Sequence, residues 1–386
     1  VINDLIDLNA TDATKSLKMP SGAAYSGTAD AGMIRNDTNG DSQGSASTMQ
    51  HFNGTDWKNY ENLPNATGVQ VLFAASTTGL TTVDVSDTSN MVVLDTLSIS
   101  NTSGVDVDMV NKVAYVYRSD GNVDAVDISD ASSLSNLSTL SDAKLTGRGQ
   151  IQLDVSKQVA YVASQDTDYF ISIDISNSSS MSILNSIANS VLDGADDVSL
   201  DLNNDVAYVS AIIADRIVSI DISTPSSMSV FGSFTNSNMD GARNLVVHSN
   251  GQTVYVACYS DNNVVAINTS TPSSMSERSV ASIGSNPIAV DIDSVNNVVY
   301  ACRYTGSSIN SIDVSNPNAI SSLDTIASNS TPRGIVVDSL NEVVFVTNAS
   351  ANQLRAFNVS NPSNMSEISV LSNSNLSAGN LALGTY

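Results

Sequence analysis

SIDISTPSSMS, residues 219–229, begins with a short apolar alternation and ends in a turn rich in serine. Six other stretches have nearly the same pattern: AVDISDASSLS from Ala125, SIDISNSSSMS from Ser172, AINTSTPSSMS from Ala266, SIDVSNPNAIS from Ser311, AFNVSNPSNMS from Ala356 and the more diverged TVDVSDTSNMV from Thr82. Aligned on their aspartate or asparagine, the copies follow one another at intervals of 43 to 47 residues. The chain is therefore built from a repeated unit.

A second marker keeps the same period. An aromatic residue lies 11 to 13 residues before each aspartate or asparagine, at Phe73, Tyr115, Tyr161, Tyr208, Tyr255, Tyr300 and Phe345. Each unit contains four β-like runs, which in the fourth unit are VSLDL, VAYVS, RIVSIDI and MSVFGSF. The second run is apolar on both sides, which predicts a strand covered on both faces. Four short antiparallel strands per unit are typical of a β-propeller blade.

The two ends of the repeat predict how the ring closes. The first unit lacks its opening strand, because only Val69 and Gln70 separate VLFAA from Asn65-Ala-Thr-Gly. The last unit is complete, and the chain then adds AGNLALGTY, in which LALG matches the opening runs of other units. A C-terminal strand that completes the first blade would remove the open sheet edges, which an open solenoid would not need. We therefore expect an all-β fold, a seven-bladed propeller over residues 65–386.

The repeats resemble a known group. VAYVAS…ISIDISNSSS and VVYACR…NSIDVSNPNA are similar to the LVIVD and YVTN families of β-propeller repeats, over residues 65–386. The resemblance implies the fold and leaves the function open, because propellers host many activities. We interpret the repeated motif as scaffold. Its aspartate or asparagine caps the serine-rich turn, and the Met, Leu or Ile that follows packs into the next blade interface.

Composition excludes some classes of partner. Acidic residues outnumber basic ones 39 to 15, for a formal net charge of −24. This charge argues against binding to nucleic acid and against docking on anionic membranes. No run of about 18 apolar residues predicts a membrane span, and VINDLIDLNA lacks the basic start of a signal peptide. Cys258 and Cys302 are expected on opposite strand faces, so no disulfide is predicted.

The first 64 residues fall outside the repeat. GMIRNDT and TMQHFNGTDWKNY predict strands, the second turning at Asn53-Gly54. This segment resembles a short module of tailed-phage fibres, on the matches Lys15–Pro20, Gly32–Asn36 and Phe52–Trp57. It departs from that module in a longer loop between the strands. The resemblance implies a small β-rich attachment or assembly segment, residues 1–64, that joins other virion proteins. The alternative is an appendage of a secreted bacterial propeller.

A metal site is suggested only by one loop. Asp37, Asn39 and Asp41 alternate as the oxygen ligands of a calcium loop do, without the glycine and final glutamate of an EF-hand. A plain polar loop is the alternative. We expect no cofactor apart from this possible calcium ion.

Ligand binding is expected where the opening strands begin, at the mouth of the central channel. The residues predicted at this channel face are Asp196, Asp197, Arg243, Asn244, Asn286, Arg333 and Asn380. Two arginines beside polar groups suit a carboxylate or a sugar. The alternative is that Arg243 and Arg333 pair with aspartates of neighbouring blades.

Catalysis has little support in the sequence. No nucleophile motif or glycine-rich phosphate loop is present. His248 replaces a repeat aspartate, which favours a local hydrogen-bonding role over that of a base. We therefore predict a binding protein without enzymatic activity: a virion fibre or spike, extracellular, exposing the propeller to a host receptor or glycan, with homo-oligomers possible. The alternatives are a secreted bacterial adhesion module and a lactonase-like hydrolase.

Overall fold

The computed structural model describes residues 34–37, 48–52, 57–59, 69–377 and 379–386, the first three ranges by their backbone alone. The chain divides into two units, Val1–Gly68 and Val69–Tyr386. In the first unit, β1 (Ile34–Asp37), β2 (Thr48–Phe52) and β3 (Trp57–Asn59) form an antiparallel sheet. Phe52 lies opposite Trp57, which confirms the predicted hairpin, while its predicted Asn53-Gly54 turn lies outside the described residues.

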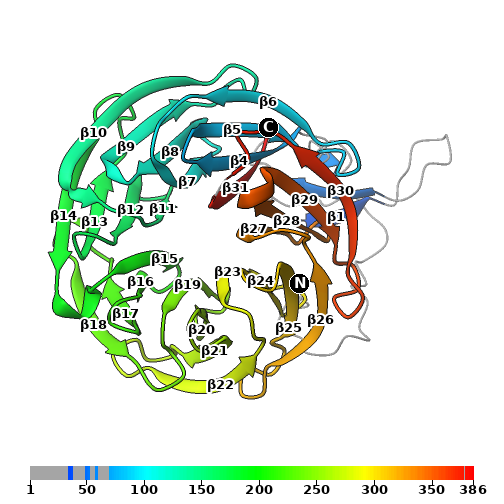
Figure 1. Ribbon diagram of the computed structural model, residues 1–386. Helices are drawn as coiled ribbons and strands as arrows, with labels where there is room; N and C mark the ends of the chain where they lie inside the picture. Colours follow the sequence, from blue (N-terminus) through cyan, green and yellow to red (C-terminus); the bar gives the residue numbers. More distant parts are fainter. Residues whose placement is uncertain (1–33, 38–47, 53–56, 60–68, 378) are drawn as a thin grey trace, which may run out of the picture. The chain divides into compact units, whose positions relative to one another are not determined.

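The second unit is a ring of seven four-stranded antiparallel sheets, the seven-bladed propeller expected from the repeats (Figure 1). Blade 1 contains β31 (Asn380–Thr385), β4 (Gln70–Ser76), β5 (Gly79–Asp84) and β6 (Val92–Leu97). The other blades use consecutive strands. Each blade lies with one strand at the centre of the ring, and we call β7, β11, β15, β19, β23, β27 and β31 the inner strands.

The remaining strands follow in chain order. Blade 2 contains β7 (Thr102–Asp108), β8 (Val113–Arg118), β9 (Asp120–Asp127) and β10 (Ser135–Thr146). Blade 3 contains β11 (Ile151–Asp154), β12 (Val159–Ser164), β13 (Tyr169–Asp174) and β14 (Ser182–Ala188). Blade 4 contains β15 (Ala195–Asp201), β16 (Val206–Ala211), β17 (Arg216–Asp221) and β18 (Ser229–Phe234). Blade 5 contains β19 (Ala242–Val247), β20 (Thr253–Cys258), β21 (Asn263–Asn268) and β22 (Ser276–Ser282). Blade 6 contains β23 (Pro287–Asp293), β24 (Val298–Arg303), β25 (Ser308–Asp313) and β26 (Ser321–Ala327). Blade 7 contains β27 (Pro332–Asp338), β28 (Val343–Asn348), β29 (Gln353–Asn358) and β30 (Ser366–Ser372). Short 3₁₀ helices lie at η1 (Ser190–Leu192), η2 (Pro225–Ser227) and η3 (Ala349–Ala351).

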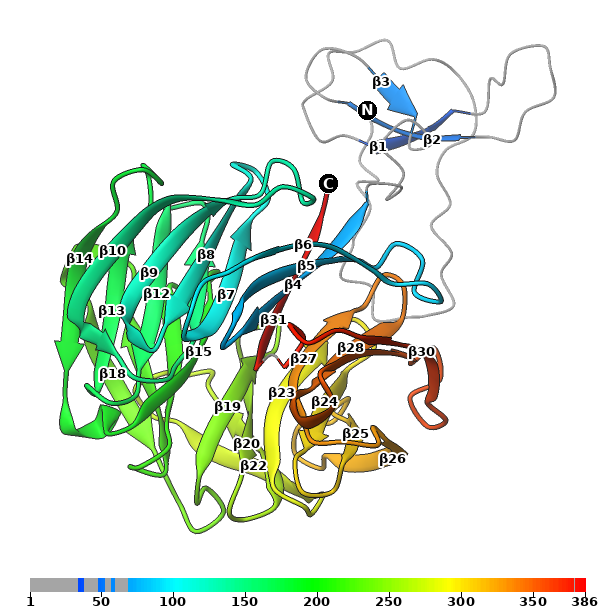
Figure 2. The same ribbon diagram turned by 45° about the horizontal axis from the view of Figure 1, so that its top comes forward.

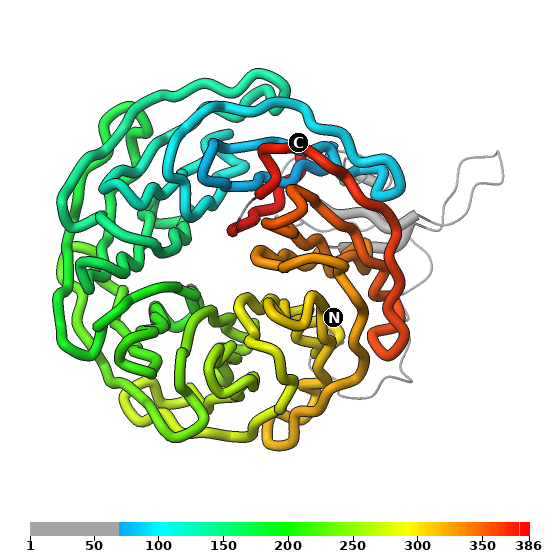
Figure 3. The backbone as a smooth tube through the Cα atoms, in the orientation of Figure 1, coloured from blue at the N-terminus to red at the C-terminus, as the bar shows by residue number. Residues whose placement is uncertain are grey.

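The C-terminal strand closes the ring. β31 pairs antiparallel with β4, with Asn380 opposite Ala75 and Thr385 opposite Gln70. In Figure 2, β31 lies between the inner strands β27 and β7, and Figure 3 shows the two ends of the propeller's chain meeting in this blade. The predicted composite blade is confirmed.

The core consists of seven apolar clusters, one between each pair of adjacent blades. The repeat aromatic residues all belong to the second strand of their blade and are at most 1% exposed. Each cluster joins residues of two blades, so no blade can bury its apolar faces alone.

The repeated motif acts as the sequence predicted, with one difference. In all seven copies the aspartate or asparagine side chain accepts a hydrogen bond from the backbone N–H two residues later, as Asp221 does from Ser223 at 2.9 Å. The apolar residue that follows packs into a blade interface. It enters the interface with the preceding blade, however, as Met228 of blade 4 does against blade 3.

A ring of hydroxyl groups also joins the blades. In every blade one Ser or Thr hydroxyl donates to a backbone carbonyl in the motif turn of the next blade: Thr82 to Ala131, Ser138 to Ser178, Ser172 to Pro225, Ser219 to Pro272, Ser279 to Pro317, Ser311 to Pro362 and Ser369 to Thr88. In blades 1, 3, 4 and 6 the hydroxyl belongs to the third strand. Where that strand has alanine, the hydroxyl comes from its partner on the fourth strand, as Ser279 does opposite Ala266.

Cys258 and Cys302 are both buried and free, in agreement with the absence of a predicted disulfide. Among the described residues, no helix has the length and apolar character needed to cross a membrane.

The hydroxyl ring predicts a measurable contribution to stability. Ser219→Ala leaves the Pro272 carbonyl oxygen without its 2.7 Å partner, so we expect the free energy of unfolding to fall by about 1–2 kcal/mol. Ser223→Ala in the same motif removes an exposed hydroxyl and should change it by less than about 0.5 kcal/mol. Urea denaturation followed by circular dichroism measures both. Equal effects of the two substitutions would contradict the role of the ring.

Candidate functional site

A cavity of about 210 Å³ lies at the mouth of the central channel, where the inner strands begin. Residues from all seven blades line it. Its polar side chains include Thr77, Ser103, Arg148, Gln150, Asp196, Asp197, Arg243, Asn244 and Arg333. A concave site with convergent polar groups is where ligands bind in folds of this kind.

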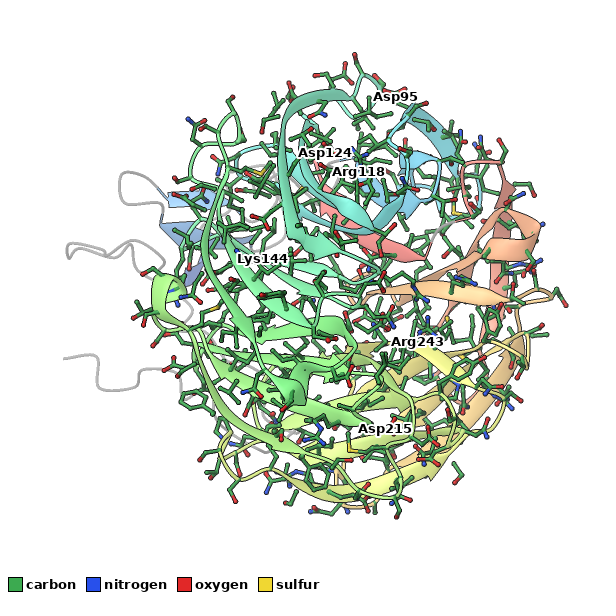
Figure 4. All side chains as sticks on the ribbon, turned by 60° about the vertical axis from the view of Figure 1, so that its left-hand side comes forward. Asp95, Arg118, Asp124, Lys144, Asp215 and Arg243 are labelled. Atoms are coloured by element: carbon green, nitrogen blue, oxygen red, sulfur yellow. The ribbon has the colours of Figure 1, made fainter. Side chains whose placement is uncertain are left out.

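Three arginines converge on this cavity. Arg243 Nε lies 3.5 Å from Asp196 Oδ2 of the preceding blade, so the predicted pairing with a neighbouring aspartate holds for this residue. Among the described residues, Arg148 and Arg333 form no ion pair, and Arg333 Nε is buried without a hydrogen-bond partner. Arg118, which does not line the cavity, differs from Arg148 and Arg333 because it forms an ion pair with Asp124 at 3.3 Å (Figure 4).

Burial and the neighbouring charges shift the pKa values of Arg243 and Asp196. Burial lowers the pKa of Arg243; Asp196 opposes this, and the nearby Arg148 and Arg333 lower the pKa further. Burial also raises the pKa of Asp196, although Arg243 and Arg148 act in the opposite direction. Asp196 is thus a carboxyl group with increased proton affinity beside two cations.

Along the inner strands, side-chain oxygens of one strand accept hydrogen bonds from backbone N–H groups of the next inner strand. We call these contacts the inner-strand ties. From donor to acceptor, they are Val105 N to Asn380 Oδ1 (2.9 Å), Leu153 N to Asp106 Oδ2 (2.9 Å), Leu200 N to Gln152 Oε1 (3.1 Å), Leu245 N to Asp197 Oδ2 (2.8 Å), Val290 N to Asn244 Oδ1 (2.6 Å) and Val337 N to Asp291 Oδ2 (2.8 Å). At the seventh junction, Asp338 Oδ2 accepts from the side chain of Gln70 in blade 1 (2.6 Å).

The ties determine what the predicted site residues do. Asp196, Arg243 and Arg333 are brought together at the cavity. Asp197 and Asn244 also line it, but their side-chain oxygens are engaged in ties, and Asn380 forms a tie without lining the cavity.

Asn286 does not line the cavity. Its Nδ2 donates to the Tyr259 carbonyl, and the strand register places Ile288 where the other blades carry their cavity residue. Val290, opposite Ala301, holds the register position of Leu245 in β19 and Ile335 in β27, so the position two residues earlier is Ile288 and the prediction of Asn286 was shifted by two residues.

Arg148 and Gln150 are two of the cavity residues that the sequence analysis did not predict. Arg148 precedes Gly149, which holds in blade 3 the position of Asp196 in blade 4, and both Arg148 and Gly149 line the cavity. A search for basic residues on either side of each predicted channel position would have found it. Gln150 lies one residue further on, and its Oε1 is buried without a partner. That unused acceptor is available to a ligand hydroxyl group.

His248 has the local role predicted for it. Its Nδ1 accepts from Asn250 N at 3.2 Å, as Asp108 Oδ1 does from Val110 N at the equivalent turn, and its Nε2 lies 3.1 Å from Asn297 Oδ1. It stands outside the cavity wall.

The calcium loop remains a prediction. Asn39 and Asp41 lie outside the described residues, and the structure describes only the backbone of Asp37, at the end of β1. In the part of the chain with described side chains, no three His, Cys, Asp or Glu residues form a group that could hold a metal ion.

Comparisons with known proteins give one family model and several solved structures of the same fold. A family model described as "Lactonase, 7-bladed beta-propeller" matches residues 71–369. Similar solved structures include a protein from Lactobacillus plantarum (14% identity, 82% of this chain and 99% of that chain, TM-score 0.71) and a putative 6-phosphogluconolactonase from Bacteroides fragilis (11%, 83% and 99%, 0.71). A periplasmic gluconolactonase from Pseudomonas aeruginosa is also similar (12%, 82% and 99%, 0.68). No curated protein sequence matches the chain.

These findings correct two expectations. The prediction of a virion fibre or spike is wrong, and so is the prediction that the chain is not an enzyme, because the match over residues 71–369 is to lactonases. The lactonase-like alternative is the better one. The error came from weighting a loose resemblance of about 45 N-terminal residues above the propeller.

The inner-strand ties predict an unusual pH dependence of stability. Burial raises the pKa of Asp291 to about 6, from 3.8. Since the folded state holds this proton more tightly than the unfolded state, the stabilisation is present below pH 4 and is lost as pH rises through about 6. Asp291→Asn should therefore gain stability relative to wild type from pH 4 to 8, by up to about 2–3 kcal/mol.

A control without this pH dependence is available in the motif. Hydrogen bonds from Ser176 lower the pKa of Asp174, so the stability that this carboxylate contributes is lost only below about pH 4, and the difference between Asp174→Asn and wild type should stay nearly constant from pH 4 to 8. Urea denaturation at pH 4, 6 and 8 measures both differences. A pH-independent difference for Asp291→Asn would show that this carboxyl group is ionised in the folded state throughout.

Proposed function

We propose, from the premise that the chain belongs to the lactonase family of seven-bladed β-propellers, that it hydrolyses lactones at the cavity where the inner strands begin. The observation that carries the proposal is the convergence of Arg148, Arg243 and Arg333 on one small cavity of an otherwise strongly acidic chain. Lactone hydrolysis creates negative charge at the carbonyl oxygen and ends in a carboxylate, and guanidinium groups stabilise both.

The reaction needs a base and an oxyanion partner. A water molecule adds to the lactone carbonyl carbon, the ring C–O bond breaks, and the ring oxygen leaves as the hydroxyl group of a hydroxy acid. Asp196 is suited to accept the water proton, because burial raises its pKa above that of an ordinary aspartate. Arg148 is close enough to influence that pKa and has no ion pair within the described part of the chain, which suits it to the carbonyl oxyanion.

The charge of the cavity favours an anionic lactone. Its three arginines face Asp196, which pairs with Arg243, and Asp197, whose pKa burial raises to about 8. At neutral pH the cavity is therefore positive. A carboxylated or phosphorylated lactone matches this charge, and one similar structure carries the name of a putative 6-phosphogluconolactonase.

The segment before the propeller keeps a separate proposal. We propose that residues 1–64 are an attachment or assembly segment, as their resemblance to a phage-fibre module suggests. The finer similarity of the blades to LVIVD and YVTN repeats, the extracellular location and a surface glycan as partner stay predictions.

The catalytic proposal is tested by replacing the base. Asp196→Asn should lower kcat for δ-gluconolactone or its 6-phosphate at least about 100-fold, because the water loses its proton acceptor. Wild-type kcat/KM should fall on the acid side with an apparent pKa above the usual range of aspartate. Asp291→Asn, a buried aspartate outside the cavity, serves as the control and should retain activity. An Asp196→Asn variant as active as wild type would contradict the assignment.

The attachment proposal is tested by solution mass. Residues 69–386 should fold alone and be monomeric by light scattering, whereas the full chain should form a larger assembly. A full chain that is monomeric, and remains so at high protein concentration, would contradict an assembly role for the first segment.

A further inference from the structure

Two cavity arginines lie over tyrosine rings. Arg243 Cζ is 5.7 Å from the centre of the Tyr259 ring, and Arg333 Cζ is 5.5 Å from the centre of the Tyr304 ring. The two rings are 6.5 Å apart and tilted by 49°. Arg243, Tyr259, Tyr304 and Arg333 thus form one continuous row across blades 5, 6 and 7, which we call the Arg–Tyr row.

The repeat does not require tyrosine at these positions. Tyr259 and Tyr304 directly follow the second strand of their blades, and their N–H groups donate to Gly241 O (2.9 Å) and Asn286 O (3.0 Å). Ile212 and Ala349 make the same backbone bond in blades 4 and 7. The bond is therefore independent of the side chain, and the Tyr304 ring packs against the apolar cluster between blades 6 and 7 as well as against Arg333.

A tyrosine ring holds a guanidinium group without neutralising it. The ring face attracts the cation and fixes the plane of the group, while the N–H edges stay available. A carboxylate would occupy those edges, as Glu367 does for Arg355. Arg333 has no such partner among the described residues, and its buried Nε donates to nothing.

We propose that Tyr259 and Tyr304 are positioning residues that hold Arg243 and Arg333 as a clamp for the anionic group of the substrate. The identity of that group as part of a lactone rests on the proposed function. Anion binding by Arg243 and Arg333 does not rest on the proposed function, because binding an anion requires no hydrolysis. The rings contribute by fixing two like charges near each other, which their mutual repulsion would otherwise drive apart.

The test uses inorganic phosphate as the probe and calorimetry of the full chain as the measurement. Wild type should bind phosphate with a dissociation constant in the millimolar range or below. Tyr304→Leu should weaken binding about three- to tenfold, because Arg333 loses its aromatic support. Tyr304→Phe keeps the ring and should stay within about twofold of wild type. Tyr169→Leu removes a half-buried tyrosine of β13 away from the cavity and should leave affinity unchanged.

A second substitution separates the clamp from general damage. In an Arg333→Met background, Tyr304→Leu should weaken phosphate binding no further, since the ring acts through that arginine. Tyr259→Leu tests the other arm through Arg243 if Tyr304→Leu does not fold, and melting curves establish folding in each case.

Three results would overturn the proposal: wild type that does not bind phosphate, a folded Tyr304→Leu variant with wild-type affinity, or a Tyr304→Phe variant as weak as Tyr304→Leu. Phosphate binding that follows the predicted pattern in a chain inactive on every lactone would keep the clamp and overturn the lactonase proposal instead.

Discussion

The free edge of the inner strand is the constraint on which the propeller depends. Each blade ends at the channel in a strand with one paired edge and one edge of backbone N–H groups that needs acceptors. At six junctions a side-chain oxygen of one inner strand accepts from the next inner strand, and at the seventh Asp338 accepts from Gln70. Further from the channel, the hydroxyl ring also joins each blade to the next by a hydrogen bond. A blade is therefore complete only beside its neighbours, and β31 is needed so that the first blade has an inner strand at all.

The candidate site is formed largely by residues of the same inner strands. At the start of β15 and β19, one residue supplies an acceptor to the scaffold and its neighbour faces the cavity: Asp197 beside Asp196, and Asn244 beside Arg243. Both residues of each pair line the cavity, but the strand register is irregular between Ala195 and Asp197 and between Ala242 and Asn244, so Asp196 and Arg243 stand outside the regular pairing while Asp197 and Asn244 form ties. The charge of the cavity can consequently be set by single residues while the ring stays intact. A positive cavity in a chain of net charge −24 shows that local fields and overall charge are independent.

Sequence analysis predicted the fold well because its signals are periodic. The repeat aromatic, the capping aspartate and LALG each follow from a pattern present in several copies. The site is a departure from the repeat, and so it was predicted only in part. Arg243 and Arg333 were found, since arginine is rare here, but Arg148 stands one residue from the expected position. Asn286 was misplaced because the strand was counted from Ile288, whereas Val290 holds the register position of Leu245 and Ile335. The hydroxyl ring was hidden, since its donor changes strand between SID and AIN copies and the contact reaches the next blade.

The central claim is that the arginine-lined cavity is where an anionic hydroxy acid or its lactone binds. A crystal structure of the full chain with 6-phosphogluconate, the product of a phosphorylated lactone, tests it most directly. Our account predicts the ligand in the cavity, with its phosphate between Arg243 and Arg333 and its carboxylate near Arg148 and Asp196. A cavity that stays empty at saturating ligand, or a ligand bound on another face of the ring, would contradict the account.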